Sequence, residues 1–272
     1  MSQPNILPKV HRKNDPENTM KELIGKTVLI TGASKGIGEA TALRMAERGM
    51  NVVLVARSEN AIIALAQKIV SNGGKAIAVA CDVADYSQVR KAVQAGKSEF
   101  GSIDIIVNNA GLIEPIAKLA ESDPDGWSQV IDVNVKGVYH TVRATLPAML
   151  ERGQGVIINI SSGAATSVLD GWSHYCSSKA AVLSLTRGIH KEVSDHGVRV
   201  VGLSPGTVAT DMQVAIKASG INPVSQLDPS VHIPADWVAQ AICWLATDDA
   251  KEFDGDDVSL RDETIRTRVG LV

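Results

Sequence analysis

The chain has 272 residues, of which 44% are hydrophobic and 21% are charged, and its formal net charge is -3. These values are typical of a soluble protein with one large α/β domain, and they exclude a strong electrostatic preference for nucleic acid or anionic lipid. Three cysteines, Cys81, Cys176 and Cys243, lie far apart, which favours a reducing compartment over a disulfide framework. No stretch reaches membrane-spanning length, so we expect a cytoplasmic protein.

Residues 1–20 are polar and irregular, and they lack the apolar run of a secretory signal. We therefore predict a flexible N-terminal arm over 1–20, followed by a single domain over 21–272.

A short apolar strand is predicted over 26–30, and a glycine-rich segment follows it at once and opens into a helical pattern. This order is typical of a dinucleotide-binding site, because glycines let the backbone approach a pyrophosphate and a helix N-terminus offers free N–H groups. A simple turn is the alternative. The residues expected to bind the cofactor here are Gly32, Ser34, Lys35, Gly36, Ile37 and Gly38.

Four more apolar runs, at 51–55, 76–81, 103–107 and 198–203, read as buried parallel strands. A fifth run, 156–160, leads into Ser161 and Ser162, which should emerge at the carboxyl end of its strand. Ligands bind at that edge of open α/β sheets.

Tyr175 and Lys179 lie four residues apart at the start of a helical pattern, so their side chains share one helix face. A nearby ammonium is expected to stabilise the phenolate and bring the pKa of Tyr175 toward neutrality. The tyrosine could then exchange a proton with an alcohol oxygen that a serine hydroxyl polarises. Taken alone, this pair could equally be an exposed feature of a helix surface.

Several motifs in this order resemble the short-chain dehydrogenase/reductase family over residues 23–260. They are the Gly-x-x-x-Gly-x-Gly turn at 32–38, Asn-Asn-Ala-Gly at 108–111, Asn134, Ser162, the Tyr-x-x-x-Lys motif, and Pro205-Gly206 with Thr210. The resemblance implies a Rossmann-like doubly wound sheet of about seven mostly parallel strands with helices on both faces. It also implies nicotinamide-dependent oxidoreduction.

By that resemblance the catalytic residues are Asn134, Ser162, Tyr175 and Lys179. The family places its serine about thirteen residues before the tyrosine, which selects Ser162 over Ser161. Its asparagine interrupts a helix and helps to hold a water that links the lysine to solvent. The lysine tunes the phenol and contacts the nicotinamide ribose. No metal is expected, and the six histidines show no zinc spacing.

The resemblance implies further cofactor contacts along the same edge of the sheet. Asp82 and Val83 would contact the adenine, although Asp82 could instead cap a helix. Asn108 could face the cofactor or stabilise the central sheet, and the sequence is compatible with both roles. The remaining expected contacts are Ala110, Gly111, Tyr175, Lys179, Pro205, Gly206 and Thr210.

The end of the second strand favours NADP(H) over NAD(H), although NAD(H) remains possible. No acid that could bind a ribose 2′-hydroxyl occupies Ala56 or Arg57. Arg57 and Lys35 could both approach a 2′-phosphate, with Ser34 as a hydrogen-bond partner. Alternatively, both cations are solvated surface charges.

The C-terminal part of the chain is expected to determine which substrate binds and how subunits associate. Residues 207–235 hold no clear strand and are expected to form a substrate-binding segment. The end of the chain, from Asp257 onward, departs from the Val-Asp-Gly-Gly ending common in the family. A homo-oligomer, dimer or tetramer, is still expected.

The leading hypothesis is an NADP(H)-dependent reductase that converts a ketone or 3-oxoacyl group to a secondary alcohol, with Tyr175 as the proton donor. Two alternatives are an alcohol dehydrogenase that works oxidatively and a protein that binds NADP(H) without turnover.

Overall fold

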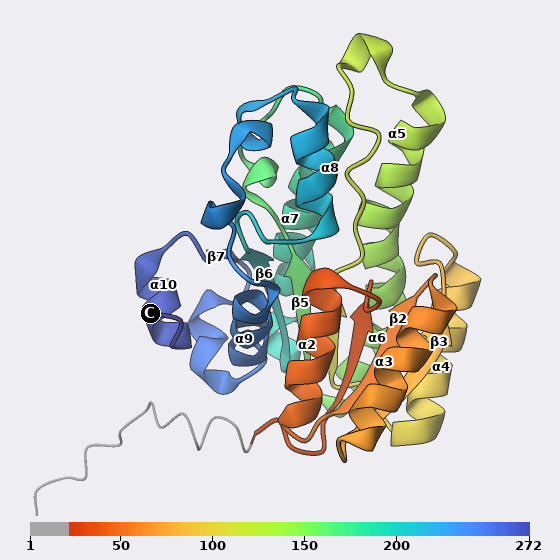
Figure 1. The fold of residues 1–272 in the computed structure, drawn as a ribbon. Coiled ribbons are helices and arrows are strands. Elements are labelled where there is room, and N and C mark those ends of the chain that lie inside the picture. Colours follow the sequence, from red (N-terminus) through yellow and green to blue (C-terminus); the bar gives the residue numbers. More distant parts are fainter. Residues whose placement is uncertain (1–21) are drawn as a thin grey trace, which may run out of the picture.

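The computed structural model describes residues 22–272, so the arm expected over 1–20 lies outside the described residues. Seven strands form one sheet in the order β3-β2-β1-β4-β5-β6-β7, and each neighbouring pair is parallel. Helices flank the sheet (Figure 1). The predicted Rossmann-like doubly wound architecture is confirmed. The strands are β1 (Thr27–Thr31), β2 (Asn51–Ala56), β3 (Lys75–Ala80), β4 (Ile105–Asn108), β5 (Gly155–Ile160), β6 (Val198–Ser204) and β7 (Asp257–Ser259).

The predicted strand bounds agree with the observed ones to within two residues, and the largest difference is at β4. That strand was expected to begin at Ile103 but begins at Ile105. The intervening Asp104 uses its side chain for pairing, since its carboxylate accepts a hydrogen bond from the Thr27 N–H at 2.9 Å. Its own N–H donates to the Thr27 carbonyl, also at 2.9 Å. The chain therefore joins the sheet before regular strand geometry starts.

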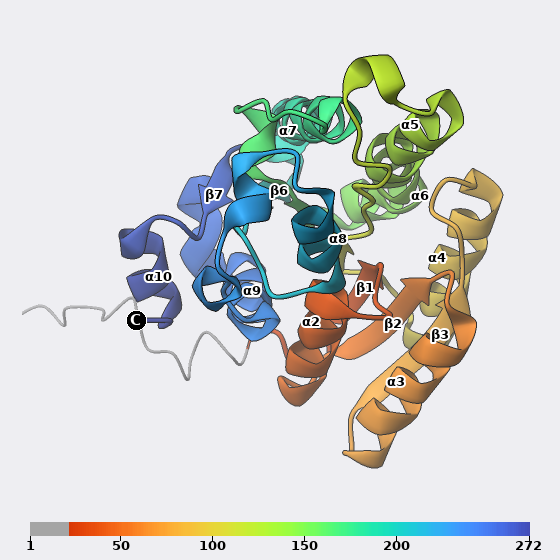
Figure 2. The ribbon, with the colours of Figure 1, turned by 45° about the horizontal axis from the view of Figure 1, so that its top comes forward.

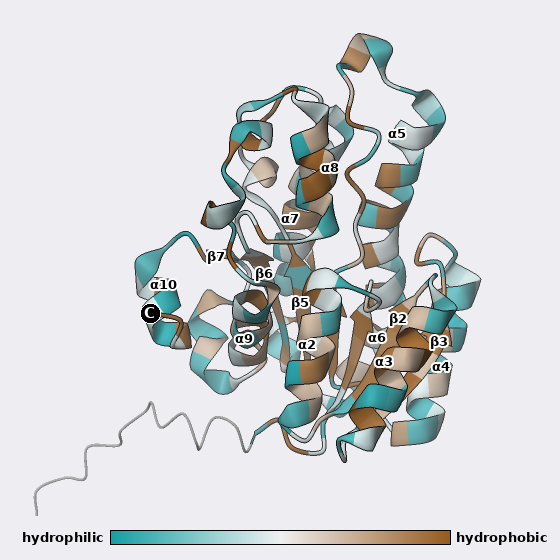
Figure 3. Cartoon of the chain, in the orientation of Figure 1, coloured by the Kyte–Doolittle hydropathy of each residue, from teal (hydrophilic) through white to brown (hydrophobic). Residues whose placement is uncertain are grey.

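Alternate residues of the strands pack into two apolar layers, because successive side chains of a strand point to opposite faces. Val28 and Ile30 of β1 belong to one layer, and Leu29 belongs to the other. α2, α3 and α9 cover the first layer, and α4, α6 and α7 cover the second (Figure 2). In Figure 3 the strands are largely apolar, whereas hydrophilic and apolar residues are mixed along the helices around them. The helices are α2 (Gly36–Glu47), α3 (Glu59–Ser71), α4 (Tyr86–Phe100), α5 (Pro124–Ile131), α6 (Gly137–Arg152), α7 (Ser173–Val193), α8 (Asp211–Ser219), α9 (Ala235–Leu245) and α10 (Glu263–Val269).

The strand order reverses direction between β1 and β4, which are neighbours in the sheet although β2 and β3 separate them in the chain. Loops that leave the two strands there diverge, and a crevice opens at the carboxyl ends. The segment 207–235 contains α8 and two short 3-10 turns, Pro223–Gln226 and Pro229–Val231. It lies over this edge of the sheet (Figures 1 and 2). Among residues 22–272, no helix has both the length and the apolar character needed to cross a bilayer.

Candidate active site

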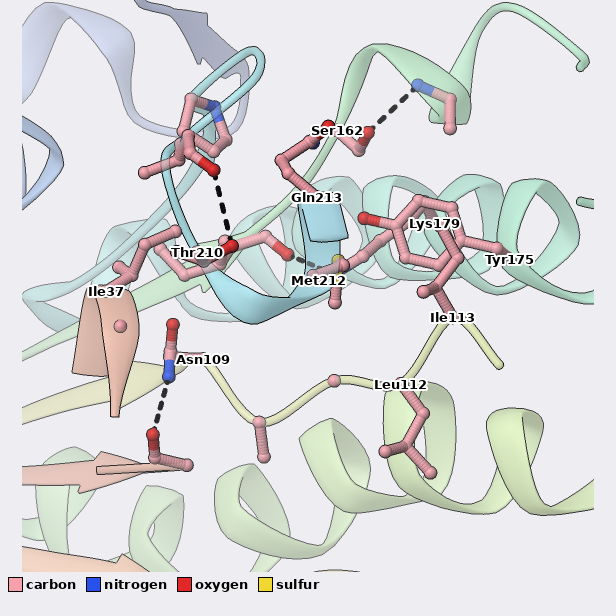
Figure 4. A pocket seen from close by; sticks show the side chains of 18 of the residues that line it. Ile37, Asn109, Leu112, Ile113, Ser162, Tyr175, Lys179, Thr210, Met212 and Gln213 are labelled. Carbon is pink, nitrogen blue, oxygen red and sulfur yellow. Dashed lines mark hydrogen bonds between the residues drawn. The ribbon is translucent and has the colours of Figure 1, made fainter. Parts of the chain in front are cut away.

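A cleft of about 1050 Å³ lies at the carboxyl edge of the sheet, where the strand order reverses. Its walls come from the glycine-rich turn, the ends of β2 to β6, the start of α7 and the segment around α8 (Figure 4). Most of the predicted site residues line it. They are Gly32, Ser34, Lys35, Gly36, Ile37, Arg57, Asp82, Val83, Ala110, Gly111, Ser162, Tyr175, Lys179, Pro205, Gly206 and Thr210. The predicted residues that do not line it are Gly38, Asn108 and Asn134.

The glycine-rich turn is a backbone cradle that larger residues would block. Gly32 and Gly36 have φ angles of +64° and +59°, a conformation that side chains other than glycine rarely adopt. A Cβ at Gly38 would lie 2.3 Å from the Gly32 carbonyl oxygen, so only glycine lets α2 pack this closely on the turn. The first N–H groups of α2 have no acceptor within the helix. The turn therefore fits the pyrophosphate of a dinucleotide.

Next to the glycine-rich turn, the cleft wall is formed by the residues that follow β2 and β3. Arg57 is exposed directly after β2. The Asp82 carboxylate accepts a hydrogen bond from the Ala84 N–H at 3.0 Å, which makes a tight turn beside the cleft. It does not cap a helix, because Asp85 is the N-cap of α4 and accepts from the N–H groups of its first turn. Asp82 therefore lines the cleft and does not serve as a helix cap.

Asn108 lies inside the sheet rather than in the cleft. Its Nδ2 donates to Asn159 Oδ1 at 2.8 Å, and the Thr141 hydroxyl donates to its Oδ1. Of the two roles left open for this residue, the structure supports the stabilising one. The neighbouring Asn109 lines the cleft instead, and its Nδ2 donates to the Thr31 carbonyl at 2.9 Å. An Asn-Asn motif does not by itself reveal which of the two amides lies inside the sheet and which faces the cleft.

Ser162, Tyr175 and Lys179 come together at one wall of the cleft (Figure 4). The Ser162 hydroxyl accepts a hydrogen bond from the Ala164 N–H at 3.2 Å, which fixes its position directly after β5. Tyr175 and Lys179 are one turn apart on α7, and Lys179 Nζ lies 5.6 Å from the centre of the tyrosine ring. Ser161 is buried, and its N–H continues the β5–β6 pairing by donating to the Leu203 carbonyl at 2.8 Å.

The expected lowering of the tyrosine pKa by the lysine is not found. Burial raises the pKa of Tyr175 to about 12, and a hydrogen bond with Ser162 partly offsets the shift. Burial also lowers the pKa of Lys179 to about 8, against the influence of the Asp257 carboxylate. Lys179 Nζ donates to the Ile160 carbonyl at 2.7 Å, and removal from water is the largest cause of the shift for both side chains. At neutral pH the phenol is protonated and can act as an acid.

Asn134 interrupts a helix, as the family resemblance implies. Residues Asp132–Lys136 form a π-helical turn between α5 and α6. The amide of Asn134 accepts from the Leu112 N–H at 2.7 Å and donates to the Leu112 carbonyl at 2.9 Å. It also donates to the Ser178 hydroxyl at 3.0 Å, next to Lys179 on α7. Asn134 therefore ties the cleft wall at Leu112 to the helix that carries Tyr175 and Lys179.

An apolar cluster that the sequence motifs do not predict lies next to Tyr175. The Trp172 ring meets the tyrosine ring edge-on, with centroids 5.6 Å apart. The buried members of the cluster are Ile113, Ala164, Trp172, Tyr175, Cys176 and Ile216. A signal was present for Trp172, because it precedes Tyr175 by three residues and so lies on the same side of the chain entering α7. The cluster gives the reaction site one apolar wall.

Known proteins share both the sequence pattern and the fold of this chain. The family model described as short chain dehydrogenase matches residues 26–219. The 3-oxoacyl-[acyl-carrier-protein] reductase of Synechocystis sp. is 38% identical over 236 residues, which cover 86% of this chain and 94% of that protein. The crystal structure of levodione reductase superposes with a TM-score of 0.81 at 27% identity, covering 87% of this chain and 96% of that one. NAD⁺-bound xylitol dehydrogenase gives a TM-score of 0.81 at 25% identity, covering 88% and 98%.

Proposed function

Because the chain belongs to the short-chain dehydrogenase family and is an oxidoreductase acting on CH–OH or C=O groups, we propose that it reduces a ketone or 3-oxoacyl group with NADP(H). The product is a secondary alcohol. The observation that carries this proposal is the buried Tyr175 phenol, which lines the cleft together with Ser162 and lies one turn from Lys179 on α7.

In the proposed reaction, Tyr175 donates its proton to the substrate carbonyl oxygen while Ser162 donates a hydrogen bond to the same oxygen. Lys179 supplies a positive charge near the phenolate that forms when the proton leaves, which favours the transfer. Asn134 holds the Leu112 wall against α7 and so keeps the two reacting side chains in register. A bound nicotinamide in its reduced form supplies the hydride for the carbonyl carbon.

The residues of the glycine-rich turn and of the β2 and β3 ends would hold the cofactor. Arg57 and Lys35 are the cations suited to a 2′-phosphate, and no acid follows β2 to bind a free 2′-hydroxyl. This pattern supports NADP(H) as the preferred cofactor, with NAD(H) as a possible substitute.

The substrate class is proposed from the cleft and from the relatives. The apolar cluster around Trp172 and Ile216 suits an aliphatic or cyclic portion beside the reacting carbonyl. The Synechocystis relative is named as a 3-oxoacyl thioester reductase, and the structural neighbour as a reductase of levodione. We propose that the segment 207–235, which includes Met212 and Ile216 in the cleft wall, selects between such substrates.

Oxidation of a secondary alcohol is the second candidate, favoured by the likeness to xylitol dehydrogenase. The same tyrosine donates a proton in reduction and accepts one in oxidation, and its protonated form is the one that begins the reduction. Ser162, Tyr175 and Lys179 are arranged for proton transfer. This arrangement argues against the alternative in which the protein binds the cofactor but turns over no substrate.

We also propose a homo-oligomer, which the exposed apolar side chains of Tyr139 and Leu150 on α6 support. Light scattering coupled to gel filtration measures its size. A cytoplasmic location stays a prediction.

The proposed function is tested by following NADPH and NADH consumption with a panel of 3-oxoacyl thioesters, ketones, diketones and quinones, with cofactor binding measured alongside. Turnover with NADPH for a ketone or 3-oxoacyl thioester is the expected result. Tight cofactor binding without turnover of any panel member, and turnover of secondary alcohols with NADP⁺ or NAD⁺, would contradict the proposal in favour of oxidation.

A further inference from the structure

An ion pair joins the two walls of the cleft at its phosphate end. Lys35 precedes α2 in the glycine-rich turn, and Asp211 is the first residue of α8, 176 positions further along the chain. Lys35 Nζ lies 2.8 Å from Asp211 Oδ2, and both residues line the cleft. The walls also touch beside this pair, since a Cβ at Gly36 would lie 3.2 Å from Thr210 Cγ2. Figures 1 and 2 both show α8 above the start of α2.

We propose that Asp211 is a specificity-determining residue that weakens the preference for NADP(H) by occupying Lys35. This inference rests on the proposed function, in which Lys35 and Arg57 bind the 2′-phosphate of the cofactor. Asp211 itself lies in the segment proposed to select the substrate.

Two electrostatic effects of the Asp211 carboxylate act in the same direction. It competes with a phosphate for the Lys35 ammonium, and its negative charge repels a dianion placed beside that ammonium. The 2′-hydroxyl of NAD(H) is uncharged, so neither effect weakens its binding. Among residues 22–272, Arg57 forms no ion pair, and only Lys35 of the two cations is held by a carboxylate.

The effect has a natural limit, because the side chains of Lys35 and Asp211 are 70% and 75% exposed. An exposed pair changes the affinity for a competing anion by at most about fivefold, and salt screens it. Since the pair also joins α8 to the glycine-rich turn, a 2′-phosphate that takes Lys35 releases this contact of the substrate segment. The coupling is reciprocal, so a substrate that draws Asp211 away from Lys35 would strengthen NADP(H) binding.

The test is the replacement Asp211→Asn, followed by titration of the full-length protein with NADPH, NADH and 2′,5′-ADP at low ionic strength. We expect Kd for NADPH and 2′,5′-ADP to fall by about three- to fivefold, while Kd for NADH stays unchanged. The gain should shrink as salt is added.

Asp236→Asn is the control, because it removes the same charge from an ion pair that joins α9 to Arg44 of α2. Asp236 Oδ1 accepts from Arg44 Nε at 2.8 Å, and neither residue lines the cleft. This variant should keep the wild-type ratio of NADPH to NADH affinity. A rise in NADPH affinity equal to that of Asp211→Asn would show a general effect of net charge and overturn the inference.

A double-mutant cycle with Lys35→Met separates this inference from the cofactor preference itself. Most of the gain from Asp211→Asn should disappear in the Lys35→Met background. The inference fails if the gain survives there, or if wild type prefers NADPH and Lys35→Met weakens NADPH binding while Asp211→Asn changes nothing. Equal affinity of wild type for both cofactors, with no effect of Lys35→Met, would instead refute the proposed preference and this inference with it.

Discussion

Replacing Lys179 by methionine should change the way in which the stability of the protein depends on pH. The lysine side chain is 5% exposed, and burial lowers its pKa from 10.5 to about 8. The unfolded chain therefore binds this proton more tightly than the folded protein does. One pKa unit corresponds to about 1.4 kcal/mol, so the charged lysine destabilises the fold by roughly 3 kcal/mol below pH 8. This cost declines as the pH rises through about 8 and is absent above about 10.5.

Methionine has a similar length and no charge, so the variant carries no such cost. The unfolding free energy of the variant minus that of wild type should be higher at pH 7 than at pH 10, by roughly 2 to 3 kcal/mol. The raised pKa values of Tyr175, Cys81 and Cys243 also alter stability at alkaline pH. These groups are present in both proteins, and their contributions largely cancel in the difference.

Urea unfolding of both proteins at several pH values between 7 and 10 measures this difference in stability. It is calculated from the urea concentrations at the two unfolding midpoints, with one m-value used for both proteins. Wild type should gain stability relative to the variant as the pH rises. A difference that stays constant across this range would show that Lys179 keeps its ordinary pKa and would refute the assignment of a desolvated ammonium beside Tyr175.

Two further changes test the cofactor site and the π-helical turn at Asn134. Arg57→Asp should reduce the ratio of NADPH to NADH affinity by about tenfold or more, because it removes a charged hydrogen bond to the 2′-phosphate and supplies an acceptor for a 2′-hydroxyl. Equal discrimination before and after the change, measured by Kd, would refute the role of Arg57. Asn134→Ala leaves the N–H and C=O of Leu112 without their partner and should lower the unfolding free energy by about 2 to 4 kcal/mol, with reduced turnover. Urea unfolding and kcat measure both effects, and wild-type values for the two would contradict the bridging role of Asn134.

The fold and most of the site could be predicted from the sequence, because they depend on local order. Apolar runs of five or six residues give the strands, and the residues that follow these runs give the edge at which ligands bind. The spacing of four between Tyr175 and Lys179 places them on one helix turn whatever surrounds them. Ser161 and Ser162 both line the cleft, so the choice of Ser162 as the catalytic serine stays a prediction.

What could not be predicted depends on the environment in three dimensions. The direction of the Tyr175 pKa shift is decided by how completely the phenol is removed from water, which motif spacing does not reveal. The inward position of Asn108 depends on Asn159 and Thr141, two partners from different elements. The pairing of Lys35 with a carboxylate 176 positions away is likewise visible only once α8 is placed over the glycine-rich turn.

The most direct test of the proposed reaction is turnover by Tyr175→Phe with NADPH and a substrate of the wild-type protein. Phenylalanine keeps the ring that packs against Trp172, so folding and cofactor binding should persist, and Kd for NADPH should stay close to the wild-type value. Loss of the proton donor should reduce kcat by at least about a hundredfold. Unchanged turnover in a correctly folded variant that binds NADPH would contradict the assignment of Tyr175 as the acid.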